Sequence, residues 1–513
     1  MESRGMEGRA QSAKNAYHTA GKGVMTFSAH NTPSAAHKKR RTAFTFPGDY
    51  CFNSPNYILS MQASSKDTIC ALATPPGGAV AIIRLSGDNS LAIADRVWSP
   101  LHGGGLGAES PRRLLMGSMG GIDASCLAVY MPGPNSYTGE DVVELQLHGG
   151  RASVRMALEA LLAYGARTAE PGEFTRRAFM NGKLDLTQAE AVADLVAAES
   201  WRAARIANAQ LEGELGAAAR AIHEELSTIL SEVESRLDFP EEEIDWMPPS
   251  ELLRRLDSCQ EKIRRLARTR REGEILRDCA KMVIAGPPNV GKSSLLNRLL
   301  GRDRAIVSPI PGTTRDTVEA DFTIKGFPVK IIDTAGARET DDLVEQSGIE
   351  RAKRAAAEAD VVLWVSDATA GETPQPKWSI PRGTMIPVIN KCDLASPPEG
   401  RLSVSAITGE GIPELEETIA RSLEDELDKG QEGGDSIGDK AEGLHVAVSA
   451  RHASLLDEAA RAVDDTRREV PSAAWELAAV PLRHAVAAIG KIVGLEVEPD
   501  ILDKIFHRFC IGK

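Results

Sequence analysis

The sequence predicts a multidomain α/β protein in which a doubly wound α/β domain is inserted into a helical domain, behind an N-terminal α+β domain. Three observations predict this. Short strand-like apolar runs separated by turn residues fill residues 67–183. Apolar residues at helical spacing follow from Ala189 to Arg236, almost without Gly or Pro, and return after residue 450. Between these two helical stretches, in residues 280–425, apolar strands end in polar motifs.

Length and composition limit the class of protein. A chain of 513 residues is long enough for two or three domains. The net charge of −13 argues against a general nucleic-acid binder, although it allows a local basic face. No apolar run approaches the ~18 residues that cross a bilayer. The seven cysteines lack paired metal spacing, which is typical of a reducing compartment, and we expect a cytoplasmic protein. Only Cys510, next to the C-terminus, suggests a functional cysteine.

The first sixty residues differ in charge from the rest. They contain eight Lys/Arg and three Asp/Glu, net +5, so the remaining chain carries about −18. The segment, up to residue 66, is read as a disordered leader or as upstream sequence before the true start at Met61. A transit peptide to an organelle is the second alternative, because such peptides are basic and poor in acids. An arm that binds nucleic acid is the third.

The N-terminal α+β domain is expected at 67–183 and the two parts of the helical domain at 184–279 and 426–513. Within the second of these ranges, Thr187-Gln-Ala-Glu190 resembles a capping box at the start of the long helical region. Further helices are expected at 251–270, 450–468 and 473–493, and residues 429–442 are read as a loop. Strands of the first domain are expected at 69–73, 80–85, 127–130 and 142–147, with a helix at 154–164.

A phosphate-binding loop lies in the middle of the chain. Gly286-Pro-Pro-Asn-Val-Gly-Lys-Ser293 fits G-x-x-x-x-G-K-[ST] and stands between a strand-like run, 282–285, and a helical pattern, 294–300. The glycines let backbone N–H groups point at a phosphate, and the helix N-terminus adds a positive dipole end. Lys292 can reach the outer phosphates, and the Ser293 hydroxyl can bind Mg²⁺.

Three later motifs follow, and the last two of them select the base. Asp333-Thr-Ala-Gly336 closes an apolar run and is the expected contact to Mg²⁺ and the γ-phosphate. Asn390-Lys-Cys-Asp393 closes the next, and a carboxylate such as Asp393 accepts from both N1 and N2 of guanine, a pair that adenine lacks. Ser403-Val-Ser405-Ala406 has the position of the loop behind guanine O6. Four such motifs in this order predict a Ras-like P-loop GTPase.

The attacking water must be oriented by a residue other than the glutamine of Ras-like enzymes. Ala337 follows the second motif, where Ras-like enzymes carry the glutamine that orients water. Candidates lie in the acidic stretch 339–345, most of which reads as solvated loop charge. Pro311-Gly-Thr313-Thr314-Arg-Asp316 is the expected switch, because a threonine here can close over Mg²⁺ and the γ-phosphate.

From residue 67 to the C-terminus, the chain resembles the tRNA-modification GTPase family MnmE, also called TrmE. Besides the GTPase set, the resemblance rests on motifs spread over the whole length: Thr74-Pro-Pro-Gly77, Arg84-Leu-Ser-Gly87, Pro132-Gly-Pro-Asn-Ser-Tyr-Thr-Gly-Glu-Asp141, His148-Gly-Gly150, Pro171-Gly-Glu-Phe174, Arg177-Ala-Phe179, Lys183-Leu-Asp185, Gln188-Ala-Glu190, Phe239-Pro240 and Phe509-Cys-Ile-Gly-Lys513.

The resemblance implies a substrate and partners. Family members act with the FAD-dependent protein MnmG, in a heterotetramer, to install an aminomethyl-type group at C5 of the wobble uridine of certain tRNAs. The one-carbon unit comes from a tetrahydrofolate. The N-terminal domain forms a homodimer and binds 5-formyl-tetrahydrofolate, and the matching contacts here are Arg84, Glu144, Lys183 and Lys513. Cys510 matches the essential terminal cysteine of the family.

The resemblance also assigns the hydrolytic residues. The GTPase domains of the family dimerise around K⁺, which acts where an arginine finger would. Glu345 matches the glutamate that orients water. Matching K⁺ positions are Asn289, Ser308, Ile310 and Thr313, and matching Mg²⁺ ligands are Ser293 and Thr314. The full set expected to bind GTP is Asn289, Val290, Gly291, Lys292, Ser293, Ser294, Ser308, Pro309, Ile310, Pro311, Gly312, Thr313, Thr314, Asp333, Thr334, Ala335, Gly336, Asn390, Lys391, Asp393, Ser405 and Ala406.

Three positions depart from the family pattern. The turn that begins at Thr74 lacks an arginine usual between its glycines, and Pro287 and Pro311 replace a common arginine and alanine. The first departure affects the folate pocket, and the prolines stiffen two GTP loops. A GTP-switched ribosome-assembly factor, with no chemistry on RNA, is the rival interpretation. The folate-like first domain and the Cys-Ile-Gly-Lys end favour modification.

Overall fold

The computed structural model describes residues 67–107, 111–239, 245–302, 321–332, 345–370, 373–429, 446–495 and 497–513. Within these ranges, no helix is long and apolar enough to cross a membrane. The leader and the switch motif predicted at 311–316 lie outside them.

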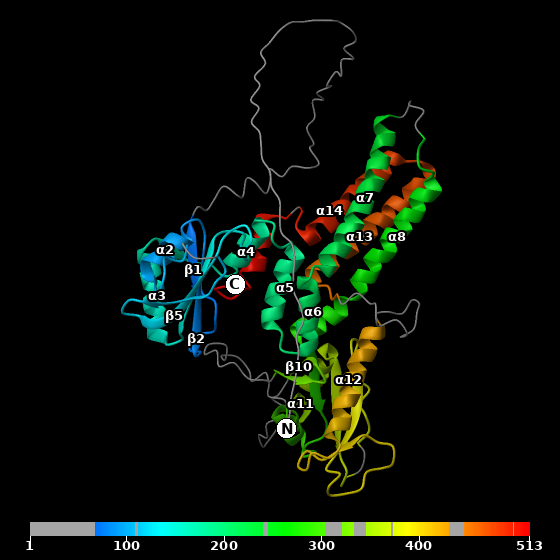
Figure 1. Ribbon diagram of the computed structural model, residues 1–513. Helices are drawn as coiled ribbons and strands as arrows, with labels where there is room; N and C mark the ends of the chain where they lie inside the picture. The colour runs from blue at the N-terminus through cyan, green and yellow to red at the C-terminus, as the bar shows by residue number, and fades with distance from the viewer. Residues whose placement is uncertain are drawn as a thin grey trace, which may run out of the picture. The chain divides into compact units, whose positions relative to one another are not determined.

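The N-terminal part is built on a seven-stranded sheet of order β3-β4-β5-β6-β2-β1-β7 (Figure 1). Neighbouring strands are antiparallel except for β1 and β7. Helices α2 (Ser90–Val97) and α3 (Arg151–Ala163) cover one face of it. The strands are β1 (Thr68–Leu72), β2 (Val80–Ser86), β3 (Ser99–Pro100), β4 (Leu115–Met119), β5 (Asp123–Met131), β6 (Val142–His148) and β7 (Ala166–Thr168).

Alternation along the strands gives the two faces of this sheet different characters. Ile83, Leu85 and Leu145 point to the face under α2 and α3 and are fully buried. The intervening Arg84 and Glu144 therefore point to the opposite face, and they lie side by side because β2 and β6 pair at these two residues. The pairing of β2 with β6 thus brings Arg84 and Glu144 together. The sequence connected these two residues only as folate contacts implied by the resemblance.

Helices that precede residue 280 and helices that follow residue 446 share one apolar core. It combines residues of α7 (Glu214–Asp238) and α8 (Pro249–Arg268) with residues of α13 (Ala450–Glu469) and α14 (Trp475–Val493). The remaining helical elements are α4 (Glu173–Met180), α5 (Leu186–Ala197), α6 (Trp201–Leu211), α9 (Arg270–Asp278), the 3-10 turn η3 (Val470–Ser472) and α15 (Pro499–Phe506).

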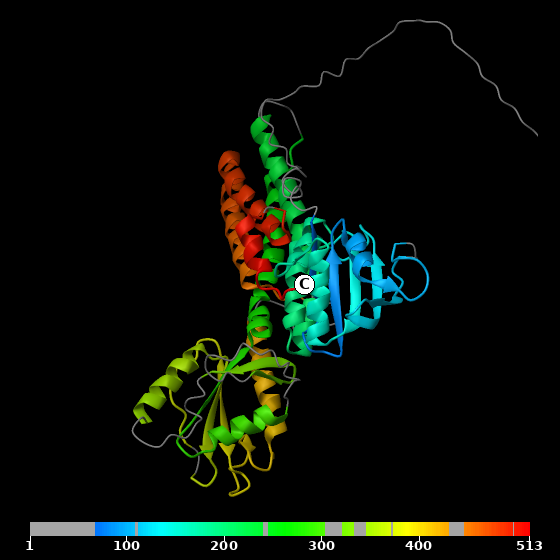
Figure 2. The ribbon, with the colours of Figure 1, turned by 90° about the vertical axis from the view of Figure 1, so that its left-hand side faces the viewer.

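The second sheet has the order β13-β12-β11-β8-β10-β9, and only β9 runs antiparallel to its neighbour. Helices pack on both faces, as Figure 2 shows, with α12 (Ile412–Lys429) on one apolar core and α11 (Glu345–Glu358) on the other. The multidomain α/β prediction is confirmed. The other elements are β8 (Ala280–Ala285), α10 (Lys292–Arg302), β9 (Asp321–Ile324), β10 (Phe327–Ile331), β11 (Val361–Asp367), β12 (Thr384–Asn390) and β13 (Ser403–Val404).

The predicted capping box was placed two residues too late. Asp185, not Thr187, caps α5: its side chain accepts from the N–H of Gln188, whose side chain accepts from the N–H of Asp185. The Thr187 hydroxyl instead donates to the Asp185 carboxylate at 2.6 Å. Both registers fit the spacing of a capping box, and the aspartate at the earlier one is the better acceptor. The long helical region is also divided, with α6 starting at its own cap, Ser200.

Candidate functional sites

The phosphate-binding loop connects β8 to α10 in a tightly wound backbone. Asn289 and Gly291 have positive φ, 62° and 89°. A side chain at Gly286 would collide with the Val365 carbonyl, and one at Gly291 with the amide of Asn390. Glycine is therefore needed at these two positions because the neighbouring strands leave no room for a side chain, and also because a phosphate must approach the backbone. The cradle that they leave fits a nucleotide phosphate.

Lys292, Ser293 and Ser294 form the first turn of α10, where free backbone N–H groups favour an anion. The Lys292 ammonium donates to two loop carbonyls, those of Gly286 at 3.1 Å and Pro287 at 2.7 Å. Burial lowers the pKa of this ammonium. Its position over the loop is suited to the outer phosphates of a nucleotide.

Asn390 and Lys391 join three loops at the carboxyl edge of the sheet. The Asn390 amide donates to the carbonyl of Val290 at 2.8 Å and accepts from the N–H of Ala406 at 3.1 Å. The Lys391 ammonium donates to the Asn289 carbonyl at 2.8 Å and to Asp367 at 2.6 Å. The motif Asn390-Lys-Cys-Asp393 therefore holds the phosphate loop in place directly.

Asp367, at the end of β11, was not predicted. Burial alone would raise its pKa, but hydrogen bonds from Lys391 and Thr369 lower it overall. Its only sequence signal was its place at the end of an apolar strand. Asp393 is exposed two residues beyond Lys391, where a carboxylate can meet a base.

The loop after β13 is rigid where it approaches Asn390. Ser405 is buried, and its hydroxyl accepts from the N–H of Thr408 at 3.0 Å. Arg298 of α10 donates through Nε to the carbonyl of Ala406 at 2.7 Å. Arg298, which the sequence did not single out, thus links the phosphate-loop helix to the guanine side of the site.

Several predicted residues lie outside the described part of the chain. These are Ser308, Pro309, Ile310, Pro311, Gly312, Thr313, Thr314, Asp333, Thr334, Ala335 and Gly336. Glu345 is the first residue of α11, and its backbone alone is described. Their assignments to Mg²⁺, K⁺ and the attacking water stay predictions.

A second polar site lies on the other face of the first sheet, beside Phe174 of α4, which packs there on Ile69 and Ala71. Arg84 donates through Nε to Glu144 Oε1 at 2.8 Å, and its Nη2 lies 2.8 Å from the same oxygen as an ion pair. The guanidinium also stacks over the rings of Tyr137, at 5.1 Å, and Phe174, at 5.7 Å. Both bonds use one carboxylate oxygen, so Oε2 has no partner among the described residues. An acceptor beside aromatic rings suits a flat ligand with paired donors, such as a pterin.

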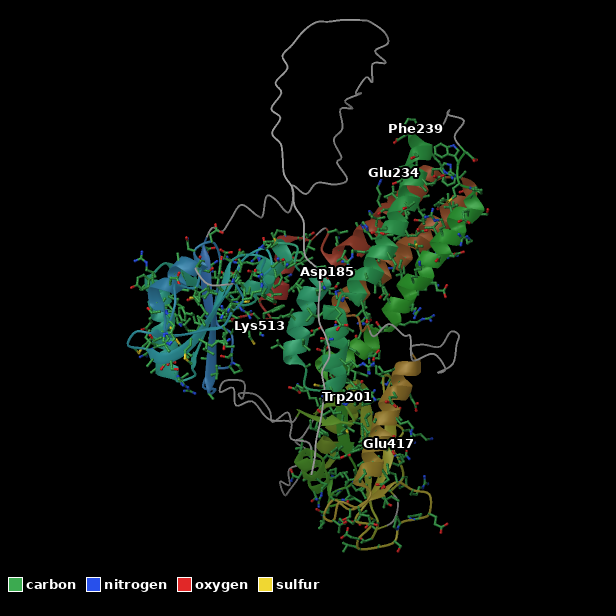
Figure 3. The ribbon with its side chains drawn as sticks, viewed as in Figure 1. Asp185, Trp201, Glu234, Phe239, Glu417 and Lys513 are labelled. Carbon is green, nitrogen blue, oxygen red and sulfur yellow. The ribbon has the colours of Figure 1, made fainter. Side chains whose placement is uncertain are left out.

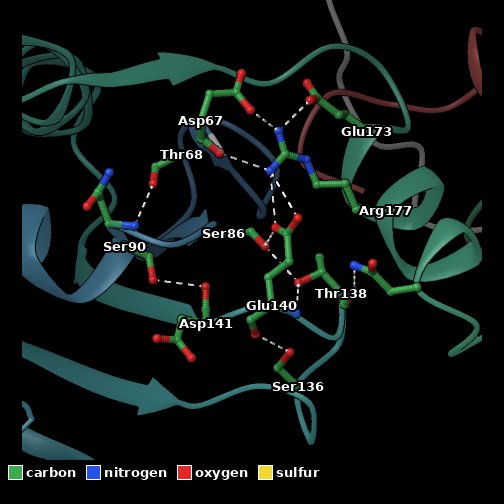
Figure 4. Close-up of polar contacts among 12 residues, drawn as sticks. Asp67, Thr68, Ser86, Ser90, Ser136, Thr138, Glu140, Asp141, Glu173 and Arg177 are labelled. Carbon is green, nitrogen blue, oxygen red and sulfur yellow. Dashed lines mark hydrogen bonds and ion pairs between the residues drawn. The ribbon is translucent and has the colours of Figure 1, made fainter. Parts of the chain in front are cut away.

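A buried arginine holds the loop that carries Tyr137 (Figure 4). Arg177 of α4 donates to Asp67 and Glu173, both at 2.9 Å, and to Glu140 at 3.1 Å. Glu140 also accepts from the Ser86 hydroxyl at 2.7 Å. Motifs that are far apart in sequence are therefore the members of one ionic network.

The C-terminal tail reaches the edge of this polar site. Gly512 packs so closely on Leu72 and Ala73, at the end of β1, that a side chain would collide with the backbone there. Ala71, one residue earlier in β1, pairs with Arg84. The tail that carries Lys513 therefore ends beside the strand next to Arg84.

Phe506 and Phe509 anchor the tail. They are buried and pack with residues of α5, while Cys510 between them and the terminus is exposed. Lys183 is also exposed and lies against the turn at Gly139, next to Glu140. The structure thus pairs Arg84 with Glu144, while Lys183 lies against the turn at Gly139 and the tail of Lys513 packs on β1. The folate role of these four residues stays a prediction.

Comparison with known proteins shows the family of the chain. The family model "GTP-binding protein TrmE N-terminus" matches residues 68–183, and "MnmE helical domain" matches residues 186–510. The chain is 44% identical over 481 residues to the tRNA modification GTPase MnmE of Synechococcus sp. (strain JA-2-3B'a(2-13)), covering 89% of this chain and 100% of that protein. It is 39% identical over 469 residues to the Aquifex aeolicus protein of the same name, covering 87% and 100%.

Among solved structures, Era in complex with MgGDPNP and a segment of 16S ribosomal RNA is similar at 29% identity. That match covers 36% of this chain and 66% of Era, with a TM-score of 0.22. The relatives at full length and the two family models together account for nearly all of the described residues. The chain belongs to the MnmE (TrmE) family of tRNA modification GTPases.

Proposed function

We propose that this protein hydrolyses GTP and, with an FAD-dependent partner, adds an aminomethyl-type group at C5 of the wobble uridine of certain tRNAs. The observation that carries the proposal is the position of the C-terminal tail. It packs against β1, the strand that pairs with β2 at Arg84, whereas a protein that only switches with GTP has no need of such a tail. The family names of the relatives support the same activity.

In GTP hydrolysis, the chain's own groups bind and orient the nucleotide. Lys292 and the N–H groups of the phosphate loop neutralise the outer phosphates, and Asp393 selects guanine. Mg²⁺, held by Ser293 and Thr314, would neutralise charge on the β- and γ-phosphates. K⁺ would take the place of an arginine finger, with Asn289 as one ligand. Glu345 would orient the attacking water.

The folate would be held on the open sheet face. Glu144 would accept from the donor edge of the pterin, and the guanidinium of Arg84 would keep that carboxylate oriented. Lys183 and Lys513 are cations suited to the glutamate tail of the folate. Cys510, exposed on the tail, would meet the reacting groups there.

A homodimer would cover the remaining apolar part of this face. Ile82, Leu127 and Val129 alternate outward on neighbouring strands, away from α2 and α3. Val80 is 56% exposed and Met116 is 53% exposed on the same face. Burying such a face against a second copy would also enclose the folate, which supports the dimer that the resemblance implies.

The direct test is mass spectrometry of wobble uridines from cells with and without the gene. We expect the modified uridine to disappear on deletion and to return with the parent gene but not with Cys510→Ser. Serine lacks the acidity and nucleophilicity of the thiol, and purified Cys510→Ser should hydrolyse GTP at the parent rate. Unchanged uridines with defective ribosomal subunits would instead support an assembly factor. Full rescue by the serine variant would leave Lys513 as the tail's functional residue.

A further inference from the structure

Helix α5 reaches from the C-terminal tail to the nucleotide-binding sheet. At its first end, the buried Leu186 and Ala189 pack in one cluster with Phe506 and Phe509, which anchor the tail. Its cap, Asp185, follows the predicted folate contact Lys183 by two residues. A helix of this length spans roughly 18 Å. If one end of α5 rotates, the other end moves with it.

The second end of α5 is tied to the strand that leads to the phosphate loop. Asp194 accepts from Arg277 Nε at 2.6 Å. Arg277 also donates to Gln210 of α6 and to the carbonyl of Ala447, both at 3.0 Å. It stands at the end of α9, and β8 begins at Ala280. One guanidinium therefore joins α5, α6 and the chain entering α13 to the start of β8.

Helix α6 makes its own contact with the nucleotide-binding domain. The indole of Trp201 lies against Gly326, in the turn between β9 and β10 (Figure 3). Arg202 stacks over the ring of Phe327, 4.2 Å from its centroid, and pairs with Glu424 of α12 at 2.6 Å. The hairpin β9–β10 lies, in sequence, between the predicted switch at 311–316 and the motif at 333–336. Helix α6 thus contacts the hairpin that lies between these two predicted nucleotide motifs in sequence.

A third ionic contact fixes the middle of α5. Glu190 accepts from Arg451 Nε at 2.8 Å and from His452 Nε2 at 2.7 Å. The N–H of Ser449 donates to Nδ1 of His452, and the guanidinium of Arg451 lies 2.8 Å from Nε2 of the same ring. Burial lowers the pKa of His452, in keeping with a neutral ring. Charged contacts therefore hold α5 at its middle and at its second end, and apolar packing holds its first end.

We propose that the α5–α6 hairpin couples the nucleotide loops to the C-terminal tail, and that Asp194 and Arg277 are positioning residues for the folate site. This inference rests on the proposed function. A shift of the β9–β10 hairpin on nucleotide binding moves α6, and the Arg277 contacts pass that shift to α5. Helix α5 then displaces the tail that carries Cys510 and Lys513. Such coupling is reciprocal, so each ligand changes the affinity of the other by the same factor.

The test measures that factor in the full-length chain. Calorimetry gives the affinity for 5-formyl-tetrahydrofolate alone and in the presence of GDP, aluminium fluoride, Mg²⁺ and K⁺. We expect the two affinities of the parent protein to differ by about fivefold or more. In Asp194→Asn and Arg277→Gln the ratio should approach one while both ligands still bind. The double variant Asp194→Arg with Arg277→Asp should recover part of the ratio.

Two further variants serve as a second disruption of the contact path and as a control. Trp201→Ala removes an exposed contact of α6 and should reduce the ratio in the same way, even if a change at the Asp194–Arg277 pair impairs folding. Arg483→Gln removes a similar ion pair within the helical bundle, to Glu234 at 2.8 Å, and should keep the parent ratio. A parent ratio of one, or an unchanged ratio in Asp194→Asn and Trp201→Ala, would overturn the inference. Absence of folate binding in the parent would instead contradict the proposed function.

Discussion

The nucleotide loops and the proposed folate face, the side of the first sheet that carries Arg84 and Glu144, are organised in opposite ways. In the nucleotide loops, side chains such as Asn390 bind backbone groups of neighbouring loops, and Asn390 is only 2% exposed. On the folate face, the charged side chains bind each other, and Arg84 and Glu144 remain 18% and 17% exposed. The first site is held by the fold itself, while the second leaves its polar groups open to a ligand or a second copy.

This difference determines which site tolerates substitution. A side chain that supports three loops cannot be removed without moving the backbone that binds phosphate. A side chain on an open face can be removed with loss of its own ligand contact alone. We therefore expect changes in the nucleotide site to spread and changes on the folate face to stay local. The following predictions test this contrast.

The largest effect is expected at Glu345. Glu345→Ala should lower the turnover of GTP hydrolysis by roughly a hundredfold or more, because the attacking water loses its orientation. The affinity for GTP should stay nearly unchanged, as fluorescent-nucleotide titration would measure. Glu358→Ala, at the exposed end of the same helix, is the matched control and should hydrolyse normally. Collapse of GTP binding in Glu345→Ala would make the residue structural.

The second effect concerns the folate face. Arg84→Met should weaken 5-formyl-tetrahydrofolate binding by about tenfold to a hundredfold, since Glu144 loses the charged hydrogen bonds that orient it. GTP hydrolysis should continue at the parent rate, as expected for a local change. Arg155→Met, on the outer side of α3, is the control and should alter neither. A slower GTPase in Arg84→Met, measured without folate, would show that the change spreads beyond its own site.

A third, smaller effect is expected at Asp367. Asp367→Asn should weaken GDP binding by about tenfold, because Lys391 loses an ionic partner that holds it against the phosphate loop. The folded-state pKa of Asp367 lies below 3.8, so the carboxylate is charged throughout neutral pH. The parent's GDP affinity should therefore show no titration from Asp367 between about pH 5 and 8. A titration in this range that disappears in Asp367→Asn would contradict the assignment.

The same contrast explains what the sequence could predict. The loops 286–293 and 390–393 are each contiguous, so the order of residues already contains their geometry. The proposed folate face contains residues 84 and 144, which strand pairing brings together, and only the resemblance connected them with residues 183 and 513. Asp367 and Arg298 lack a motif of their own. The capping box was misplaced because two acceptors at a spacing of two residues fit the same pattern.

The smallest effect is expected at Gln260, far in sequence from both sites. This residue is 4% exposed on the side of α8 that carries Leu256 and Ile263. Neither its amide nitrogen nor its oxygen has a partner among the described residues. An unpaired buried amide costs about 1–3 kcal/mol, and methionine fills a similar volume without a polar group.

Gln260→Met should therefore stabilise the helical part by about 1 kcal/mol, visible as a higher urea midpoint of its unfolding transition. GTP turnover should not change, because the nucleotide loops are held by their own hydrogen bonds. Folate affinity is the sharper measurement, since the helical core borders α5 and the tail. A changed folate affinity with constant GTP turnover would show that the open face takes its geometry from the helical core. If GTP turnover changed instead, the nucleotide loops would be the more dependent site, and the contrast between the two sites would be reversed.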